Sequence, residues 1–256
     1  MVLLVVITAA ASALLDNVTT VLLVAPVTLL VCDRIGVRPE GFLIAEVMAS
    51  NIGGTATLIG DPPNIIIASR ADLSFNDFLL NLAPFVVVAF IVFLVLARWL
   101  FRRSFTYHPE RVQAVMTMDE RRAIRDPALL RRSLIVLGLV MLGFVLHSAL
   151  HLEPSIIALL GAGLLVVVSR TSSSEYLEEV EWPTLVFFMG LFVMVGALVN
   201  VGVIGALGEA AIEAVGDDYF RAAAGLLFGS AALSGIVDNI PDVASMVPLV
   251  SDLVEA

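Results

Sequence analysis

Two stretches of the chain, residues 12–27 and 234–249, carry the same polar residues inside otherwise apolar sequence. Four residues of the first stretch recur 222 positions later in the second: Ser12 and Ser234, Asp16 and Asp238, Asn17 and Asn239, and Pro26 and Pro248. A carboxylate and an amide are costly to place inside a membrane, and ionisable residues there mark functional sites by default. The repeat therefore predicts two related polar sites, each built on an Asp-Asn pair.

The apolar background of these motifs indicates a membrane protein. Of the 256 residues, 59% are hydrophobic and the mean hydropathy is +1.01, whereas soluble domains are about 45–50% apolar. We therefore expect an all-α polytopic membrane protein. The single cysteine, Cys32, excludes a disulfide framework. Neither a nucleotide-binding loop nor a nucleophile elbow is present, and we expect no enzyme, no cofactor and no metal beyond a transported sodium ion.

Residues 1–32 predict a re-entrant hairpin. Met1–Leu15 and Val18–Cys32 are uncharged, and each would form a helix of about 22 Å, shorter than the bilayer core of about 30 Å. The polar residues between them would form a tip at mid-membrane. Non-helical backbone is tolerated at that depth only where protein or water surrounds it.

A second interruption is expected in residues 41–69. The segment Ser50–Asn64 contains three glycines and two adjacent prolines, with apolar sequence on both sides. Glycine lets the backbone unwind, and proline removes amide donors. This pattern predicts a broken membrane helix, the device with which transporters expose helix ends to solutes.

The remaining segments set the expected topology. Residues 1–101 would form part of a first repeat ending in a span at 78–101, and residues 133–256 part of a second, with three spans and a re-entrant hairpin at 219–256. Nine of the 14 basic residues lie between Arg98 and Arg132, which places the loop 102–132 in the cytoplasm. Five crossings between the hairpins give them opposite orientations, as in inverted-repeat transporters.

The motif segments resemble the ion transporter superfamily, in particular the ArsB/NhaD permeases and the melanosomal P protein, which share a citrate transporter-like domain. Four stretches carry the resemblance: SALLDNVTTVLLVAPVT, AEVMASNIGGTATLIGDPPNIII, WPTLVFFMGLFVMVG and LSGIVDNIP. The resemblance implies an inverted-repeat secondary transporter in which re-entrant hairpins and broken helices meet at a central site.

The chain departs from this family pattern in two ways. It starts inside the first hairpin and lacks a broken helix after the second, so we expect an incomplete fold, a fragment that is unstable and inactive alone. Asp242 also stands where relatives carry an apolar or aromatic residue.

The resemblance implies secondary active transport of an anion such as arsenite, citrate or a dicarboxylate, coupled to a sodium or proton gradient. A sodium/proton antiporter without an anion substrate and a passive anion channel remain alternatives. The expected partners are the lipid bilayer of the plasma (inner) membrane, a small anion or cation, and a second copy in a homodimer of the complete protein, with no nucleic acid. The expected binding residues are Asp16, Asn17, Thr19, Ser50, Asn51, Gly53, Gly54, Thr55, Asp61, Asn64, Asp238 and Asn239.

Overall fold

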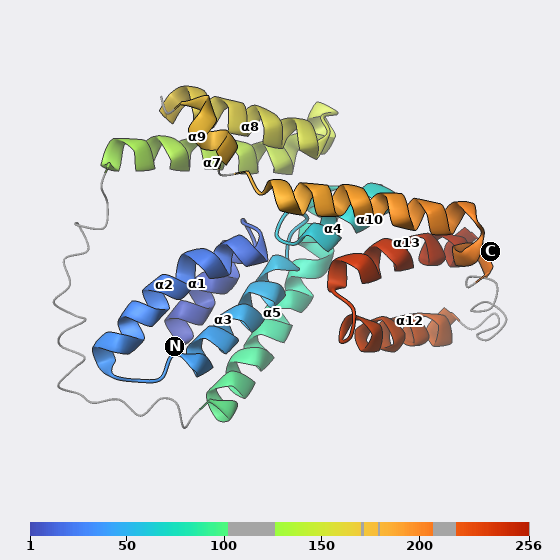
Figure 1. Ribbon diagram of the computed structural model, residues 1–256, viewed down its shortest axis with the longest axis horizontal. Helices are drawn as coiled ribbons and strands as arrows, with labels where there is room; N and C mark the ends of the chain where they lie inside the picture. The colour runs from blue at the N-terminus through green and yellow to red at the C-terminus, as the bar shows by residue number, and fades with distance from the viewer. Residues whose placement is uncertain (102–125, 170–171, 179, 207–218, 256) are drawn as a thin grey trace. The chain divides into compact units, whose positions relative to one another are not determined.

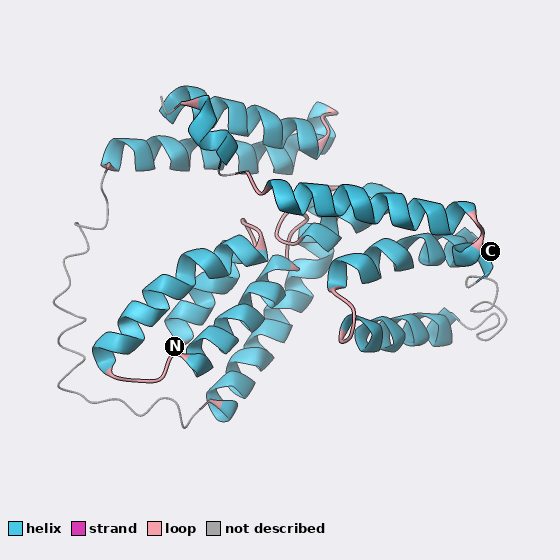
Figure 2. Ribbon diagram, viewed as in Figure 1, coloured by secondary structure: helices cyan, strands magenta, loops and turns pink. Residues whose placement is uncertain are grey.

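The computed structural model describes residues 1–101, 126–169, 172–178, 180–206 and 219–255. Within these ranges the secondary structure is helical and contains no strand (Figure 2). Four described helices are long and apolar enough to cross a membrane: Asn17–Ile35, Phe75–Leu100, Pro127–Leu150 and Trp182–Asn200. The expected all-α polytopic membrane protein is therefore confirmed.

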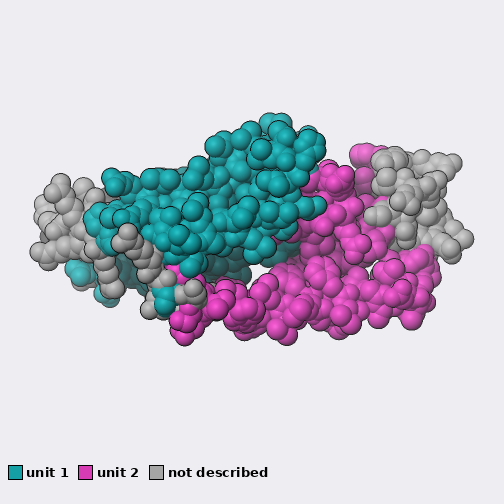
Figure 3. Space-filling model, turned by 90° about the horizontal axis from the view of Figure 1, so that it is seen from above, with its two compact units in different colours: residues 1–64, 74–173 teal, residues 65–73, 174–256 magenta. Residues whose placement is uncertain are grey.

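The described chain forms two compact units, and each is described by itself (Figure 3). The first comprises residues 1–64 and 74–173, and the second comprises residues 65–73 and 174–256. The first unit contains α1 (Val2–Ser12), α2 (Asn17–Ile35), α3 (Glu40–Gly54), α5 (Phe75–Leu100), α7 (Pro127–Leu150) and α8 (Pro154–Ser169). The second contains α10 (Trp182–Asn200), α12 (Tyr219–Ser234) and α13 (Asn239–Glu255), while α4 (Pro62–Ala71) and α9 (Ser173–Glu178) extend across the division.

The first two helices form a hairpin. Within this chain the arm α1 has 11 residues, about 16 Å of helix. The arm α2 has 19 residues because Asp16 caps its start and the helix continues past Cys32 to Ile35, where Gly36 ends it in the left-handed conformation. This arm is longer than the sequence predicts and reaches about 28 Å.

The helix expected at 41–69 is interrupted within the glycine- and proline-rich stretch. The helix α3 ends at Gly54 and α4 begins at Pro62, so residues 55–61 form a non-helical connection. Proline is favoured in the first turn of a helix because its missing amide has no partner there. The break therefore lies where the sequence places it.

Packing around α3 forms the core of the first unit. The helix packs against α1, α2 and α5 (Figure 1), and the buried cluster consists of Val5, Ala9, Ala45, Ala49, Phe93 and Ala97. Most of these side chains are small. Small residues let helix backbones approach closely, which is how helices associate in membranes.

The helices α5 and α7 are joined near the start of α5. The Phe75 ring stacks on the Phe144 ring with centroids 5.7 Å apart, and His147 Nε2 accepts a hydrogen bond of 3.0 Å from the Phe75 amide. The helix α7 begins at Pro127 with Asp126 as its cap, so residues 127–132 of the expected loop are helical. Residues 102–125 of that loop lie outside the described residues.

The second unit repeats the hairpin. The arms α12 and α13 pack together, and α13 also packs on α10, with Ile66, Leu191, Val195 and Ala244 buried between the elements. Both second arms contain a proline at the repeated position, Pro26 in α2 and Pro248 in α13. Residues 207–218, inside the expected second repeat, lie outside the described residues.

Candidate functional site

The two hairpin turns have the same local geometry. Helix α1 ends at Ser12 and α2 begins at Asn17, and their counterparts Ser234 and Asn239 end α12 and begin α13. Three backbone hydrogen bonds of the first turn also have a counterpart 222 residues later. The amides of Leu14 and Leu15 donate to the Ala11 carbonyl, and those of Ile236 and Val237 donate to the Leu233 carbonyl. The Thr20 amide donates to the Asp16 carbonyl, and the Asp242 amide donates to the Asp238 carbonyl. The sequence repeat is therefore a structural repeat at the level of the hairpin turn.

The first hairpin turn contacts the end of α3 directly. Ser12 Oγ donates a hydrogen bond of 2.7 Å to the Ser50 carbonyl, and both side chains are buried. At the accessible side, the Asn17 amide nitrogen donates to Asn51 Oδ1 at 2.8 Å. The two helix interruptions that the sequence predicts thus meet in the first unit, through residues 34 and 38 positions apart.

Asp16 stabilises the hairpin turn as well as standing in the predicted site. Its Oδ2 accepts hydrogen bonds from the Thr19 amide at 2.8 Å and from Thr19 Oγ1 at 2.9 Å. This is the N-cap arrangement that satisfies free amides of a first helical turn. The side chain also lies at the positive end of the α2 dipole, where an acidic residue stabilises the start of a helix.

The break between α3 and α4 is held by side-chain bonds to backbone carbonyls. Asn64 Nδ2 donates to the Gly54 carbonyl at 3.1 Å and to the Thr57 carbonyl at 2.8 Å. Thr57 Oγ1 donates to the Ala13 carbonyl at 2.6 Å and accepts from the Gly60 amide at 3.1 Å. These bonds satisfy backbone groups that unwinding removes from the helix, which buried backbone requires.

Two glycines at this contact are required by close backbone approach. A Cβ on Gly53 would overlap the backbone carbonyl of Ala9, and one on Gly60 would overlap Gly54 and lie 2.7 Å from the Ser12 carbonyl oxygen. Any larger residue must therefore displace backbone. Helix α3 and the break can approach the first hairpin this closely only because these positions lack side chains.

The other predicted residues of the first repeat lie in the same region. Asp61 is buried before α4, and its carbonyl accepts the Asn64 amide at 3.0 Å. Ser50 Oγ donates to the Val47 carbonyl, and the exposed Thr55 Oγ1 donates to the Asn51 carbonyl, both at 2.9 Å. The structure therefore gathers all ten predicted residues of repeat one around one contact. Their binding of a solute remains a prediction.

The predicted residues of the second repeat lie at the α12–α13 turn in the other unit. Asp238 is exposed and Asn239 is half-buried. One turn on, Asp242 is only 3% exposed, and its Oδ2 accepts a hydrogen bond of 2.7 Å from Ser230. The meeting of the two hairpin tips at one central site remains a prediction.

The whole chain, residues 1–256, matches the family model described as citrate transporter (CitMHS). The chain belongs to the citrate transporter family. Membership confirms the resemblance to the ion transporter superfamily, and with the apolar helices it makes this a multi-pass membrane protein of a transporter family.

The similar curated proteins extend beyond this chain. An uncharacterized transporter of Mycobacterium tuberculosis is 58% identical over 100% of this chain and 60% of its own length. An uncharacterized transporter of Synechocystis is 34% identical over 94% of the chain and 54% of its own length. The human P protein is 32% identical over 96% of the chain and 39% of its own length. The chain thus spans about 60% of the length of the mycobacterial relative.

Several residues of the contact between the first hairpin and the break do not stand out in the sequence alone. Ser12 and Thr57 bond to backbone carbonyls across the contact, yet isolated hydroxyl residues are common in apolar helices. Glu46 is fully buried on α3 and accepts a hydrogen bond from Thr28 of α2. The sequence does single out Glu46, because it is the one charged residue in the apolar run 41–49.

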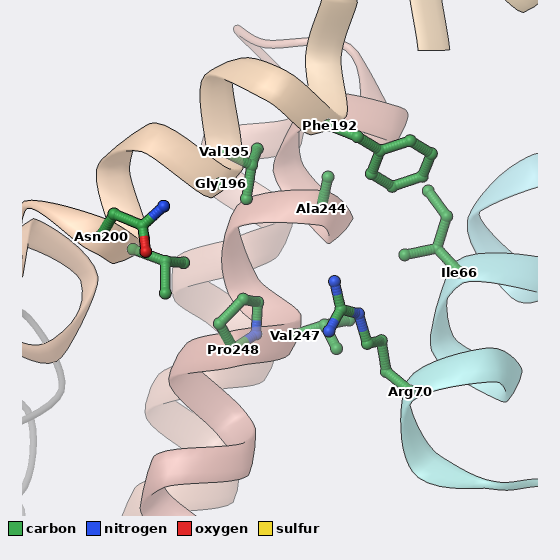
Figure 4. Close-up of a pocket in the computed structure, with 10 residues that line it drawn as sticks. Ile66, Arg70, Phe192, Val195, Gly196, Asn200, Ala244, Val247 and Pro248 are labelled. Atoms are coloured by element: carbon green, nitrogen blue, oxygen red, sulfur yellow. The ribbon is translucent and has the colours of Figure 1, made fainter. Parts of the chain in front are cut away.

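A pocket in the second unit contains none of the predicted residues. Figure 4 shows it between α4, α10 and α13, with a volume of about 320 Å³. Its lining is mostly apolar, and Arg70 and Asn200 are its two strongly polar side chains. The polar cluster of the first unit therefore remains the better candidate for binding an ion.

Removing the Asn17–Asn51 amide contact is expected to weaken the link between the hairpin and the break. We expect Asn17→Ala and Asn51→Ala each to lower stability, and the double variant to lose less than their sum, with a coupling of about 0.5–1.5 kcal/mol. Thermal unfolding in detergent measures the cycle. Strict additivity would show that the two amides do not interact in the folded protein.

Proposed function

We propose that this chain is part of a secondary active transporter that moves a small anion and is driven by a sodium or proton gradient, with citrate the first carboxylate to test. The observation that carries the proposal is the contact between two helix interruptions, made by Ser12 with Ser50 and by Asn17 with Asn51. Interrupted helices that meet inside a membrane protein are a recurrent way to build a solute site. The family membership supports the same reading.

The polar groups at the contact between the first hairpin and the break suit a partly dehydrated ion. They comprise the amides of Asn17 and Asn51, the carboxylates of Asp16 and Asp61, and the N-terminus of α2. A helix N-terminus attracts anions through free amides and its dipole. The carboxylates would hold a bound cation such as sodium, whose positive charge would in turn attract an anion.

A sodium/proton antiporter without an anion substrate is the second candidate. Residues 12–20 and 50–64, which build the cluster, contain no lysine or arginine. Recognition of a polyvalent anion usually uses such side chains because they pair with carboxylates in charge-assisted hydrogen bonds. Without them, the carboxylates alone could carry cations in both directions.

Reconstituted transport separates these functions. Full-length protein in liposomes is expected to accumulate labelled citrate above the external concentration when a sodium or proton gradient is imposed. Uptake that stops at equal concentrations would instead identify a passive channel. Sodium-dependent proton movement without uptake of citrate, arsenite or a dicarboxylate would identify the antiporter. In cells, we place the protein in the plasma membrane with the loop 102–132 facing the cytoplasm.

A further inference from the structure

A row of polar side chains is buried where α3 packs on α1 and α2. We call it the polar seam, and it consists of Thr8, Ser12, Thr20, Thr28, Glu46 and Ser50, each at most 2% exposed. Apart from Cys32, the buried residues of α2 are threonines of this seam. Helices associate in membranes partly through such side chains, but a carboxyl among them is unusual and costly.

Glu46 is the only ionisable residue of the polar seam. The side chain is 0% exposed, and its Oε1 accepts a hydrogen bond from Thr28 Oγ1. Its other oxygen, Oε2, is buried without a hydrogen-bond partner among the described residues, as is Thr20 Oγ1. The carboxyl is therefore only half satisfied in this packing.

The surroundings of Glu46 suit a neutral carboxyl better than a charged one. Its neighbours on α3, Ala45 and Ala49, are fully buried in the apolar cluster. Among the described side chains, the titratable group that interacts with it is the Cys32 thiol of α2. The helix α1 contains no charged residue, and the charged residues of α5 stand near its two ends. A buried charge without a close partner is expensive, and a bound proton removes that cost.

A divalent metal cation fits this carboxyl less well than a proton does. Hard divalent cations take about six to eight oxygen ligands, whereas Glu46 is joined in this structure by one hydroxyl. Within the described residues, no group of three or more His, Cys, Asp or Glu side chains could hold a metal ion. The unpartnered oxygen of Glu46 can bind a single proton without any further ligand.

We propose that Glu46 is a proton-binding site of this protein, that Thr28 is the residue that positions its carboxyl, and that the proton it carries is the one coupled to transport. The coupling clause rests on the proposed function, whereas proton binding itself does not. One proton adds to Oε2 to give a carboxylic acid, and the same proton leaves to restore the carboxylate. Ser50 lies one turn further along α3 and its carbonyl accepts from Ser12, so the site is linked to the hairpin contact.

Infrared difference spectroscopy on the full-length protein in lipid tests proton binding directly. A pH titration should show a carbonyl-stretch band of a protonated carboxyl group that is lost in Glu46→Gln. The band should persist in Glu40→Gln, a matched control that replaces an exposed glutamate on the same helix. In Thr28→Val, which keeps the carboxyl and removes its hydrogen bond, the band should shift to higher frequency.

The outcomes distinguish this proposal from the proposed function. If the carboxyl bands that change with pH are the same in Glu46→Gln as in the wild type, Glu46 does not bind a proton and the proposal is overturned. If Glu46→Gln does not fold, an unshifted band in Thr28→Val overturns it instead. In liposomes, proton movement driven by substrate should be lost in Glu46→Gln and kept in Glu40→Gln. Proton-coupled transport that survives Glu46→Gln overturns the coupling while the transporter function stands. Loss of the band together with no transport of any anion by the wild type upholds the proton site and refutes the function.

Discussion

Replacing Gly53 by alanine is expected to destabilise the protein by about 3 kcal/mol or more, the upper end of what overpacking a core usually costs. The new methyl group would overlap the backbone of Ala9, and backbone cannot rotate away as a flexible side chain can. To relieve the overlap, α3 must move away from α1 and stretch the Ser12–Ser50 contact. Thermal unfolding in detergent, together with transport in liposomes, measures both consequences.

The matched control for Gly53 is Gly138, which lies in α7 of the same unit. A Cβ at Gly138 would meet no atom within 4 Å, and alanine is a better helix former than glycine by about 1 kcal/mol. Gly138→Ala should therefore leave stability unchanged or raise it slightly. If both variants behave alike, then the close approach of α1 and α3 does not exist in the protein.

Changing Asn64 to aspartate is expected to open the break between α3 and α4. The variant keeps the shape of the side chain and removes both donors, so the Gly54 and Thr57 carbonyls lose their partner. A buried group left unsatisfied costs about 1–3 kcal/mol, and more beside a charge. Unfolding should therefore occur at markedly lower temperature. The loss of stability relative to the wild type should become smaller as the pH falls, because a protonated carboxyl group can donate to one of the two carbonyls.

The matched control for Asn64 is Asn81, an exposed residue of α5. Its amide makes one hydrogen bond, of 2.7 Å, to the Asp77 carbonyl of the previous turn. Asn81→Asp should change stability by no more than about 0.5 kcal/mol, as is usual for surface positions. Equal losses in the two variants would mean that Asn64 does not bridge the break.

The sequence predicts the interruptions because local chemistry decides them. A helix cannot continue through Pro62-Pro63 with its amides satisfied, and Asp16 caps the helix that follows it. The length of α2 is less predictable, since Asp33 and Arg34 are charged and yet continue the helix. Hydropathy shows where apolar sequence ends, but a helix can continue past that point into polar surroundings.

The partners of the buried side chains could not be predicted. The bond from Ser12 to Ser50 joins residues 38 positions apart, and that from Thr28 to Glu46 joins residues 18 positions apart. Which helix faces meet depends on the packing of α1, α2 and α3 together, and no single segment contains that information. Thus the sequence shows Glu46 as a charged residue in an apolar helix, but its hydrogen-bond partner on α2 is known only from the structure.

The position of Cys32 gives the protein its own chemical gauge of helix separation. It is the single cysteine of the chain, it is 1% exposed, and it lies on α2 one turn beyond Thr28. A buried thiol is inert until the surrounding structure opens. The rate at which a maleimide modifies Cys32 would therefore report how often α2 separates from its neighbours, without an engineered cysteine in this part of the protein.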